Sequence, residues 1–228
     1  MSRRSLQMNR MEPFQHHQFL LSFDGKLGLS PPDKDDYPAK SVLDVGTGTR
    51  TWAIKFGELN PEAESRVPPN VIFEVDDIEE PWTFSLPFDY IHSRMMTSSI
   101  SNWRRLIQNA FEFVSYSFAF SFRNPFKTSD QNQSDLTLSG YLALQKMDLM
   151  PQSDDDQRYD CAAATELNRS FQDILDLVNV MKEIGFVDVS IKEVKWPTNT
   201  WPKEQHYKLI GQWAHENCMS GSRTDRRE

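Results

Sequence analysis

Cysteine is scarce in this chain: Cys161 and Cys218 are the only two among 228 residues. They are far apart and cannot supply either a disulfide framework or the closely paired ligands of a structural metal site. We therefore predict no bound metal. We expect an intracellular protein, cytoplasmic, with the nucleus as the alternative compartment.

Long apolar runs and an excess of positive charge are also lacking. The most apolar stretch, "LIQNAFEFVSYSFAFSF", is interrupted by Gln108, Asn109 and Glu112, whereas a membrane span needs ~20 apolar residues. The first residues contain no apolar core of a secretory signal. With 25 basic and 33 acidic residues, the net charge is -8, which is unfavourable for contacts with nucleic-acid phosphates. We expect neither a membrane span nor direct nucleic-acid binding.

The chain does contain alternating strand and helix patterns, and its hydrophobic content of 38% can fill a core. In the first half, apolar periodicity and turn residues predict strands at 40–45, 70–77 and 88–93 and helices at 51–59 and 101–113, with Ser101 as N-cap. A short amphipathic segment, with a turn at "DGK", precedes them.

In the second half, we predict a strand at 116–122, a polar insertion at 127–160 with a helix near 138–149, a helix at 166–186, a strand at 187–194, and an edge strand and terminal helix at the end. The helix at 166–186 ends at Gly185 and has an apolar stripe of Leu167, Phe171, Ile174, Val178 and Met181. About six strands alternating with helices predict a doubly wound α/β sheet. We expect a tail at 1–12, one domain at 13–218 whose insertion at 127–160 is a candidate lid, and a tail at 219–228.

The stretch "LDVGTGTR" at 43–50 follows the first predicted strand. A glycine-rich turn there brings backbone N–H groups and a helix N-terminus towards a ligand. Asp44 lies two residues before Gly46, and the third glycine of a dinucleotide loop is missing. A carboxylate suits the cationic amino-acid end of S-adenosylmethionine (SAM) better than a pyrophosphate. We predict that Asp44, Gly46, Thr47 and Gly48 bind this cofactor; the alternative is a structural turn with a capping Asp.

A second candidate is "FEVDDIEEPW", in which acidic residues follow a predicted strand. Open α/β sheets bind ligands at the carboxyl ends of their strands. We predict that Asp76, Asp77 and Ile78 bind the cofactor, with Asp77 and the Ile78 amide addressing the adenine. The alternative is an N-cap followed by a solvated acidic turn.

Weaker candidates for a substrate pocket are His16, His17, Arg94 and Met95. The alternatives are surface or core histidines and a methionine that only packs. No Ser-His-Asp, Cys-His or metal constellation occurs, so the catalytic residues are unknown. Methyl transfer often requires only positioning and electrostatics around a cofactor that carries the reactive group.

The motifs "QHHQFLLSFDGKLGLSP", "VPPNVIFEVDDIEEPWTF", "FDYIHSRMM", "NWRRL" and "WPKEQHYKLIG" occur in this order around the glycine loop. Over residues 13 to 218 the chain resembles the LaeA-type family of fungal SAM-dependent methyltransferases, which are linked to secondary metabolism. The resemblance implies a Rossmann-like class I methyltransferase fold: a mostly parallel sheet, helices on both faces and a C-terminal antiparallel edge. It also implies SAM as cofactor and a small-molecule or protein methyl acceptor, and it allows a regulatory protein partner. The "FQHHQF" segment would help to close the pocket.

The chain departs from the family pattern in three places. Arg50 stands where the family has glycine, and the "KPGG" turn before the fifth strand of the family is replaced by "VSYSFAF". The second strand with its ribose-binding acid is missing, because only Ser65 and Arg66 stand where that strand should be. Two explanations of the gap remain open: the chain is a degenerate family member, or the sequence comes from an imperfect gene model that dropped an exon boundary.

Three functions are therefore considered. A SAM-dependent methyltransferase that acts in or regulates secondary metabolism fits the ordered motifs. A catalytically degenerate homologue that acts as a regulator or scaffold fits Arg50 and the missing acid. An NAD(P)-dependent oxidoreductase is disfavoured by the glycine spacing and by the lack of a Tyr–Lys pair.

Overall fold

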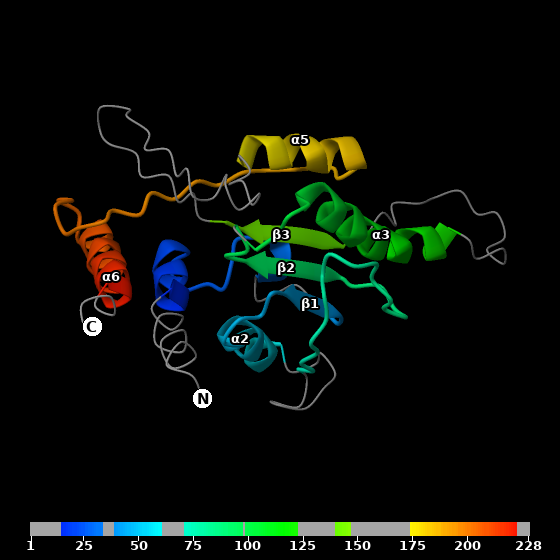
Figure 1. Ribbon diagram of the computed structural model, residues 1–228, viewed down its shortest axis with the longest axis horizontal. Coiled ribbons are helices and arrows are strands. Elements are labelled where there is room, and N and C mark those ends of the chain that lie inside the picture. The colour runs from blue at the N-terminus through cyan, green and yellow to red at the C-terminus, as the bar shows by residue number, and fades with distance from the viewer. Residues whose placement is uncertain are drawn as a thin grey trace, which may run out of the picture.

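A computed structural model describes residues 15–33, 39–60, 71–97, 99–122, 140–146 and 174–222, with side chains described outside 115–122, 174 and 217–222 (Figure 1). Residues 15–22 are helical. They are followed by η1 (Pro31–Asp33), β1 (Val42–Val45), α2 (Thr51–Leu59), β2 (Tyr90–Arg94), α3 (Trp103–Phe122), β3 (Tyr141–Gln145), α5 (Ile174–Ile184) and α6 (Gln205–Ser222).

The three strands form one parallel sheet in the order β1-β2-β3. In Figure 1, α2 lies beyond β1 at the bottom, whereas α3 and α5 lie on the opposite side, with the helix of residues 15–22 and α6 at one end. A parallel sheet covered by helices on both faces confirms the predicted α/β Rossmann-like architecture. The helices that follow β1 and β2 lie on opposite faces of the sheet, and open α/β sheets bind ligands at the carboxyl ends of their strands.

Strand residues alternate between two apolar clusters, as the period of two in a strand requires. One cluster joins the sheet to α3 and α5, and its buried members are Val45, Ile91, Ile100, Trp103, Leu106, Ile107, Ala110, Val114 and Leu177. The other joins the sheet to α2 and the N-terminal segment, and its buried members are Leu27, Ala39, Trp52, Ala53, Phe56, Tyr90 and Ala143. The polar side chains of Asp44 and His92 follow the same alternation and lie on the α2 side.

The predictions of the first half are largely confirmed. β1, α2, β2 and α3 begin within two residues of the expected positions, and the turn at "DGK" forms. The N-cap of α3 is Asn102 and not Ser101, because Asn102 Oδ1 accepts the Arg105 N–H at 3.0 Å. α6 is also confirmed, and α5 confirms the predicted helix over Ile174–Ile184, while residues 166–173, with Leu167 and Phe171, lie outside the described residues. Gly185 follows the end of α5 with φ +124°. The buried face of α5 is not centred on the predicted apolar stripe, because its buried residue is Leu177, which the stripe did not include.

Two predictions around 116–149 are wrong. Residues 116–122 continue α3 as helix, because each residue added to an existing helix forms one more hydrogen bond, and this outweighs a local strand-like alternation. Residues 141–145 are the strand β3 and not part of a helix. A signal for this strand is Gly140, where a Cβ would lie 2.8 Å from Phe88 O, so that only glycine allows the chain to enter beside β2. The rest of the insertion lies outside the described residues.

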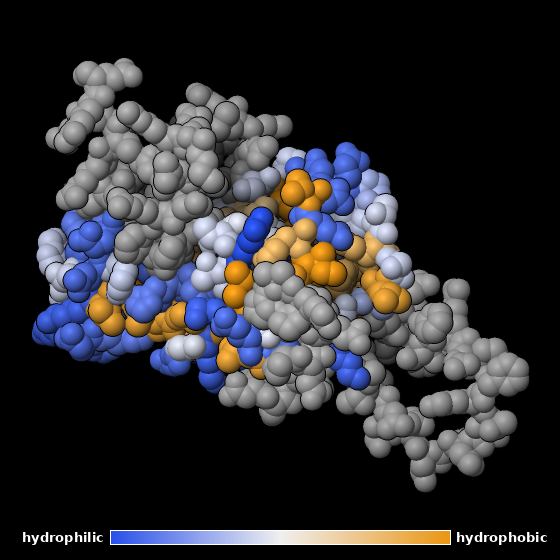
Figure 2. All heavy atoms as spheres, turned by 90° about the horizontal axis from the view of Figure 1, so that it is seen from below, coloured by the Kyte–Doolittle hydropathy of each residue, from blue (hydrophilic) through white to orange (hydrophobic). Residues whose placement is uncertain are grey.

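Three further strands were predicted where the structure has irregular chain without sheet pairing: 71–77, 187–194 and the segment before α6. An apolar alternation makes a strand only when a neighbouring strand supplies hydrogen bonds. Within the described residues no strand pairs with the outer edge of β1, and no antiparallel edge forms. Figure 2 shows a face on which apolar side chains lie among hydrophilic ones, and the exposed large apolar residues include Leu59, Ile72 and Val75.

Candidate cofactor-binding site

The glycine loop joins β1 to α2 at the carboxyl edge of the sheet. Gly46 and Gly48 have φ of +75° and +51°, which glycine adopts without steric cost. A Cβ on Gly46 would overlap the Met96 sulfur. The N-cap residue of α2, Arg50, makes no side-chain hydrogen bond to the first turn of the helix. The loop therefore leaves a helix N-terminus that can receive an anionic group.

Arg50 itself adopts the left-handed conformation, with φ +72°. Its N–H donates to Thr47 O at 2.8 Å and its carbonyl accepts the Ile54 N–H at 3.0 Å. The guanidinium lies over the Phe73 ring, 4.6 Å from the ring centroid. The charge of Arg50 is thus directed onto Phe73 of the segment 71–77. The left-handed conformation also explains why glycine suits this position.

Asp44 lies at the end of β1 and is paired with a buried histidine of β2. Its Oδ1 is 2.7 Å from His92 Nδ1, and the exposed fractions of the two side chains are 9% and 0%. The Trp52 ring stacks on the imidazole at 3.6 Å between centroids and 6° between planes. Within the described part of the chain, no hydrogen bond reaches Asp44 Oδ2. One carboxylate oxygen is therefore held, and the other remains for a ligand.

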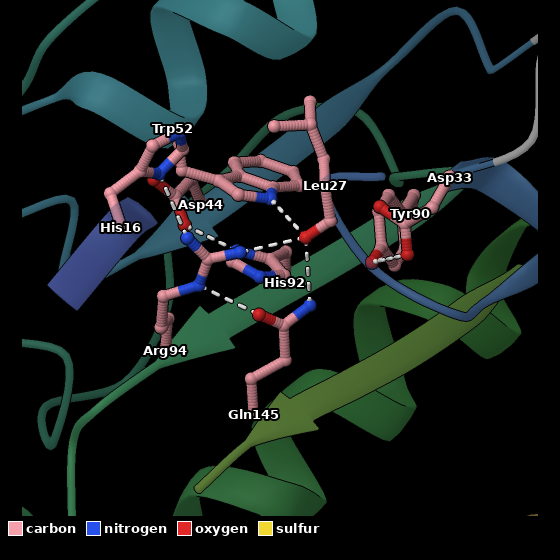
Figure 3. A network of polar contacts seen from close by, with 9 residues as sticks. All are labelled: His16, Leu27, Asp33, Asp44, Trp52, Tyr90, His92, Arg94 and Gln145. Atoms are coloured by element: carbon pink, nitrogen blue, oxygen red, sulfur yellow. Dashed lines mark hydrogen bonds and ion pairs between the residues drawn. The ribbon is translucent and has the colours of Figure 1, made fainter. Parts of the chain in front are cut away.

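Arg94, at the end of β2, connects three parts of the chain (Figure 3). Its Nε donates to Gln145 Oε1 at 2.7 Å, and its two terminal nitrogens contact His16 Nδ1 at 3.0 Å and Leu27 O at 2.7 Å. The guanidinium also lies 4.5 Å from the Phe19 ring centroid. Leu27 O accepts further hydrogen bonds from Trp52 Nε1 and Gln145 Nε2. These contacts fasten the N-terminal segment 15–33 across the carboxyl ends of β2 and β3.

Burial shifts several ionisation equilibria in this network. Desolvation, followed by the Arg94 charge, lowers the pKa of His16 to about 4. Desolvation lowers the pKa of Arg94 to about 10, against the opposing effect of Asp44 and Asp33. Burial raises the pKa of Asp33 above its ordinary value, and raises the pKa of Tyr90, which donates a hydrogen bond to Asp33 Oδ2 at 3.0 Å, well above its own. At neutral pH, His16 is therefore uncharged and accepts a hydrogen bond from a charged arginine.

The acidic turn after the segment 71–75 has the geometry of the alternative interpretation. Asp76 Oδ1 accepts the Asp77 N–H at 2.9 Å, and Asp77 Oδ1 accepts the Glu79 N–H at 3.0 Å. Asp76 and Asp77 are exposed, whereas Ile78 packs against the cluster beneath α3. Glu79 Oε1 accepts the Ser101 N–H at 2.8 Å and its hydroxyl at 2.7 Å. The turn is thus a capped turn attached to the start of α3.

The remaining predicted pocket residues are separated by the structure. His16 joins Arg94, but the ring of His17 lies 4.5 Å from the Trp213 ring of α6. Met95 is half-buried with φ +59°, and its N–H donates to Gln145 O at 2.9 Å.

Sequence reasoning missed His92 and Trp52 in the site. The register could have indicated His92, because it lies directly opposite Asp44 in the parallel pair β1–β2. Trp52 was predicted only as an apolar helix residue, and its stacking on His92 could not be derived from helical periodicity.

Among the residues whose positions are described, no group of three His, Cys, Asp or Glu side chains is arranged to hold a metal ion. Within the same residues, every helix is too short or too polar to cross a membrane.

Comparisons with known proteins indicate the family of the chain. A family profile described as a methyltransferase domain matches residues 14–191. The protein named "Probable methyltransferase tdiE" of Emericella nidulans is 31% identical over 227 residues, covering 90% of this chain and 63% of its own length. "Methyltransferase pytC" of Aspergillus terreus is 26% identical over 218 residues, with shares of 90% and 63%. "Secondary metabolism regulator LAE1" of Cochliobolus heterostrophus is 25% identical over 240 residues, with shares of 93% and 70%.

The chain spans about 63% of the length of the first two of these relatives. The match of the family profile covers most of the chain and includes the glycine loop, the acidic turn and all three strands. The chain belongs to the methyltransferase domain family.

Proposed function

We propose that this chain is a SAM-dependent methyltransferase that acts in or regulates secondary metabolism. One observation carries the proposal: Asp44 Oδ2 is unpartnered within the described residues, beside a loop whose two glycines have positive φ. The names of the relatives, two methyltransferases and a regulator of secondary metabolism, support the same function.

The residues present fit the amino-acid end of SAM. This end carries an ammonium and a carboxylate, so it needs one acidic and one electropositive partner. Asp44 is the acidic partner, and the start of α2 with the N–H groups of Gly46, Thr47 and Gly48 is the electropositive partner. When bound, SAM supplies a sulfonium-linked methyl group, and the chain has to orient this group and exclude water.

The adenine end is assigned to Asp76, Asp77 and Ile78. Asp77 uses Oδ1 within its own turn, which leaves Oδ2 for an adenine amino group. Ile78 is fixed by packing against the cluster beneath α3. The position where the family has its ribose-binding acid falls in 61–70, outside the described residues, and the sequence has Ser65 and Arg66 there in place of the acid.

The methyl acceptor, a small molecule or a protein, is assigned to the side of the site formed by His16, Arg94 and Met95. The ring of His17 packs against the Trp213 ring of α6, so we place His17 at the edge of this region. The proposed domain runs from 13 to 218. We also propose that a regulatory protein partner binds it, and we place the protein in the cytoplasm or nucleus.

Calorimetry with S-adenosylhomocysteine tests this function, with Asp44→Asn as the variant that alters the amino-acid end of the site. We expect the wild-type chain to bind, and Asp44→Asn to weaken binding about tenfold or more, because an ionic partner of the ammonium is lost. No binding at millimolar ligand would refute the proposal. Transfer of labelled methyl groups from SAM to fungal extract fractions would then identify the acceptor class.

A second function is a catalytically silent regulator that retains the fold. The observation that favours it is the segment 71–77, which pairs with no described strand although the residues that we assign to the adenine lie at and directly after its end. Binding of S-adenosylhomocysteine without methyl transfer to any extract fraction would support it, whereas turnover would exclude it.

A further inference from the structure

We propose that His92 is a positioning residue for the cofactor: it holds Asp44 so that Oδ2 faces the ammonium of the amino-acid end. This inference rests on the proposed function. His92 is fully buried and therefore acts through Asp44 and not by touching the ligand.

The contact between the two side chains is short and directional. His92 Nδ1 is 2.7 Å from Asp44 Oδ1, the distance of a charge-assisted hydrogen bond. An ionised carboxylate has only acceptors, so Nδ1 carries the proton. Donation to Oδ1 fixes the rotation of the carboxylate and leaves Oδ2 as the oxygen that a ligand can reach.

The imidazole is held in its plane from the α2 side. Trp52 stacks on it at 3.6 Å and nearly parallel, and Trp52 is fixed in turn by its hydrogen bond to Leu27 O at 3.3 Å. The N-terminal segment, α2, β2 and β1 are thus coupled in one series of contacts that ends at Asp44 (Figure 3).

Among the residues that the structure describes, the hydrogen bond to Asp44 is the one polar contact of this imidazole. His92 Nε2 is buried and has no hydrogen-bond partner within the described residues. Burying an unpaired ring nitrogen is unfavourable, and an apolar ring would fill the space beside Trp52 without that penalty. The bond from Nδ1 therefore explains why an imidazole occupies this position.

The test compares His92→Asn with His92→Gln, two neutral amides that differ in the position of the donor. The Asn amide nitrogen lies near the position of Nδ1, whereas the Gln amide extends past it. His92→Phe removes the donor but keeps a flat ring against Trp52. His215→Phe, at an exposed position of α6, is the control for a general effect of replacing histidine.

Calorimetry of each variant uses two probes. S-adenosylhomocysteine has the amino-acid end, and methylthioadenosine lacks it while retaining the adenosine and the sulfur. We expect His92→Gln and His92→Phe to weaken S-adenosylhomocysteine binding about tenfold or more, with methylthioadenosine binding unchanged. His92→Asn should retain most of the wild-type affinity for both probes, and thermal unfolding shows which variants are folded.

Equal weakening of both probes, or unchanged binding of S-adenosylhomocysteine in folded His92→Gln, would overturn the role of His92. If His92→Phe does not fold, the Asn and Gln pair decides the question. If neither amide variant folds, the ¹⁵N signals of wild-type His92 decide it: a protonated Nδ1 that shifts with S-adenosylhomocysteine and not with methylthioadenosine supports the role, and any other pattern overturns it. Failure of the wild-type chain to bind S-adenosylhomocysteine would instead overturn the proposed function, and the inference with it.

Discussion

Replacement of Arg94 by methionine tests whether the polar contacts behind the glycine loop hold the segment 15–33 in place. The change removes three hydrogen bonds, to Gln145 Oε1, His16 Nδ1 and Leu27 O. At about 1 kcal/mol net for each bond, this amounts to about 3 kcal/mol. The methionine variant no longer buries a cation, and the loss of this unfavourable desolvation offsets part of the destabilisation. We therefore expect the free energy of unfolding to fall by about 2 kcal/mol.

Urea denaturation measures this loss, and Arg105→Met is the matched control. Arg105 lies exposed on α3, so its replacement should change the free energy of unfolding by less than about 0.5 kcal/mol. Hydrogen exchange adds a local measurement: amides of 15–33 should exchange faster in Arg94→Met, while those of α3 keep their protection. Equal stability of the two variants, or unchanged exchange in 15–33, would refute the view that Arg94 anchors the N-terminal segment.

Three smaller predictions concern single residues. The pKa of His16 is about 4 in the folded chain and ordinarily 6.5, so between these pH values the unfolded chain binds an extra proton. The urea concentration at the midpoint of unfolding should therefore decrease when the pH is lowered from about 7 to about 5, and it should decrease less in His16→Gln. Arg50→Gly should be more stable than Arg50→Ala by about 0.5 to 1 kcal/mol, because alanine keeps the left-handed strain and both variants lose the contact with Phe73; equal melting temperatures would contradict this. Gly46→Ala should lower stability by about 1 to 3 kcal/mol through its positive φ and its overlap with Met96, and a second change, Met96→Ala, should restore part of the loss in thermal unfolding.

The elements that the sequence predicted correctly are those decided by local chemistry. β1 and β2 are apolar runs bounded by turn residues, and α2 ends before the Asn-Pro pair, so each is specified within a few residues. The wrong predictions depend on distant neighbours. Residues 71–77 have the apolar character of a strand, yet no described strand lies beside them to supply hydrogen bonds. Residues 141–145 contain a spacing that also suits a helix, and their place beside β2 makes them a strand.

The candidate site likewise contains residues that local sequence predicts and residues that only the fold brings together. The residues of the glycine loop could be predicted because their spacing follows from the backbone conformation they adopt. The supporting side chains could not, because His92 is 48 positions from Asp44 and Gln145 is 51 positions from Arg94. Only the parallel register of the three strands brings these pairs together. The direction of the Arg50 side chain likewise depends on a distant neighbour, because its guanidinium lies over the Phe73 ring.

The two ends of the proposed cofactor site differ in how firmly they are built, and this difference leads to a final prediction. Asp44 is held by buried contacts to His92, whereas Asp77 is exposed on a turn that follows an unpaired segment in which Ile72 is 76% exposed and Val75 fully so. Ligand binding should therefore change the amide exchange of residues 74–80 more than that of β1, whose hydrogen bonds exist without ligand. Saturating S-adenosylhomocysteine should slow exchange in 74–80, and methylthioadenosine, which retains the adenine, should do the same at equal occupancy.

The double-mutant Asp76→Asn, Asp77→Asn is the control for this effect and should abolish the protection in 74–80 while leaving that of the glycine loop. Protection confined to the glycine loop in the wild-type chain would mean that the acidic turn does not bind the adenine. The chain would then hold only the amino-acid end of the ligand. A site that binds only the amino-acid end cannot orient the methyl group, which lies between the amino-acid and adenine ends of the cofactor. This outcome would therefore favour the silent regulator over the enzyme.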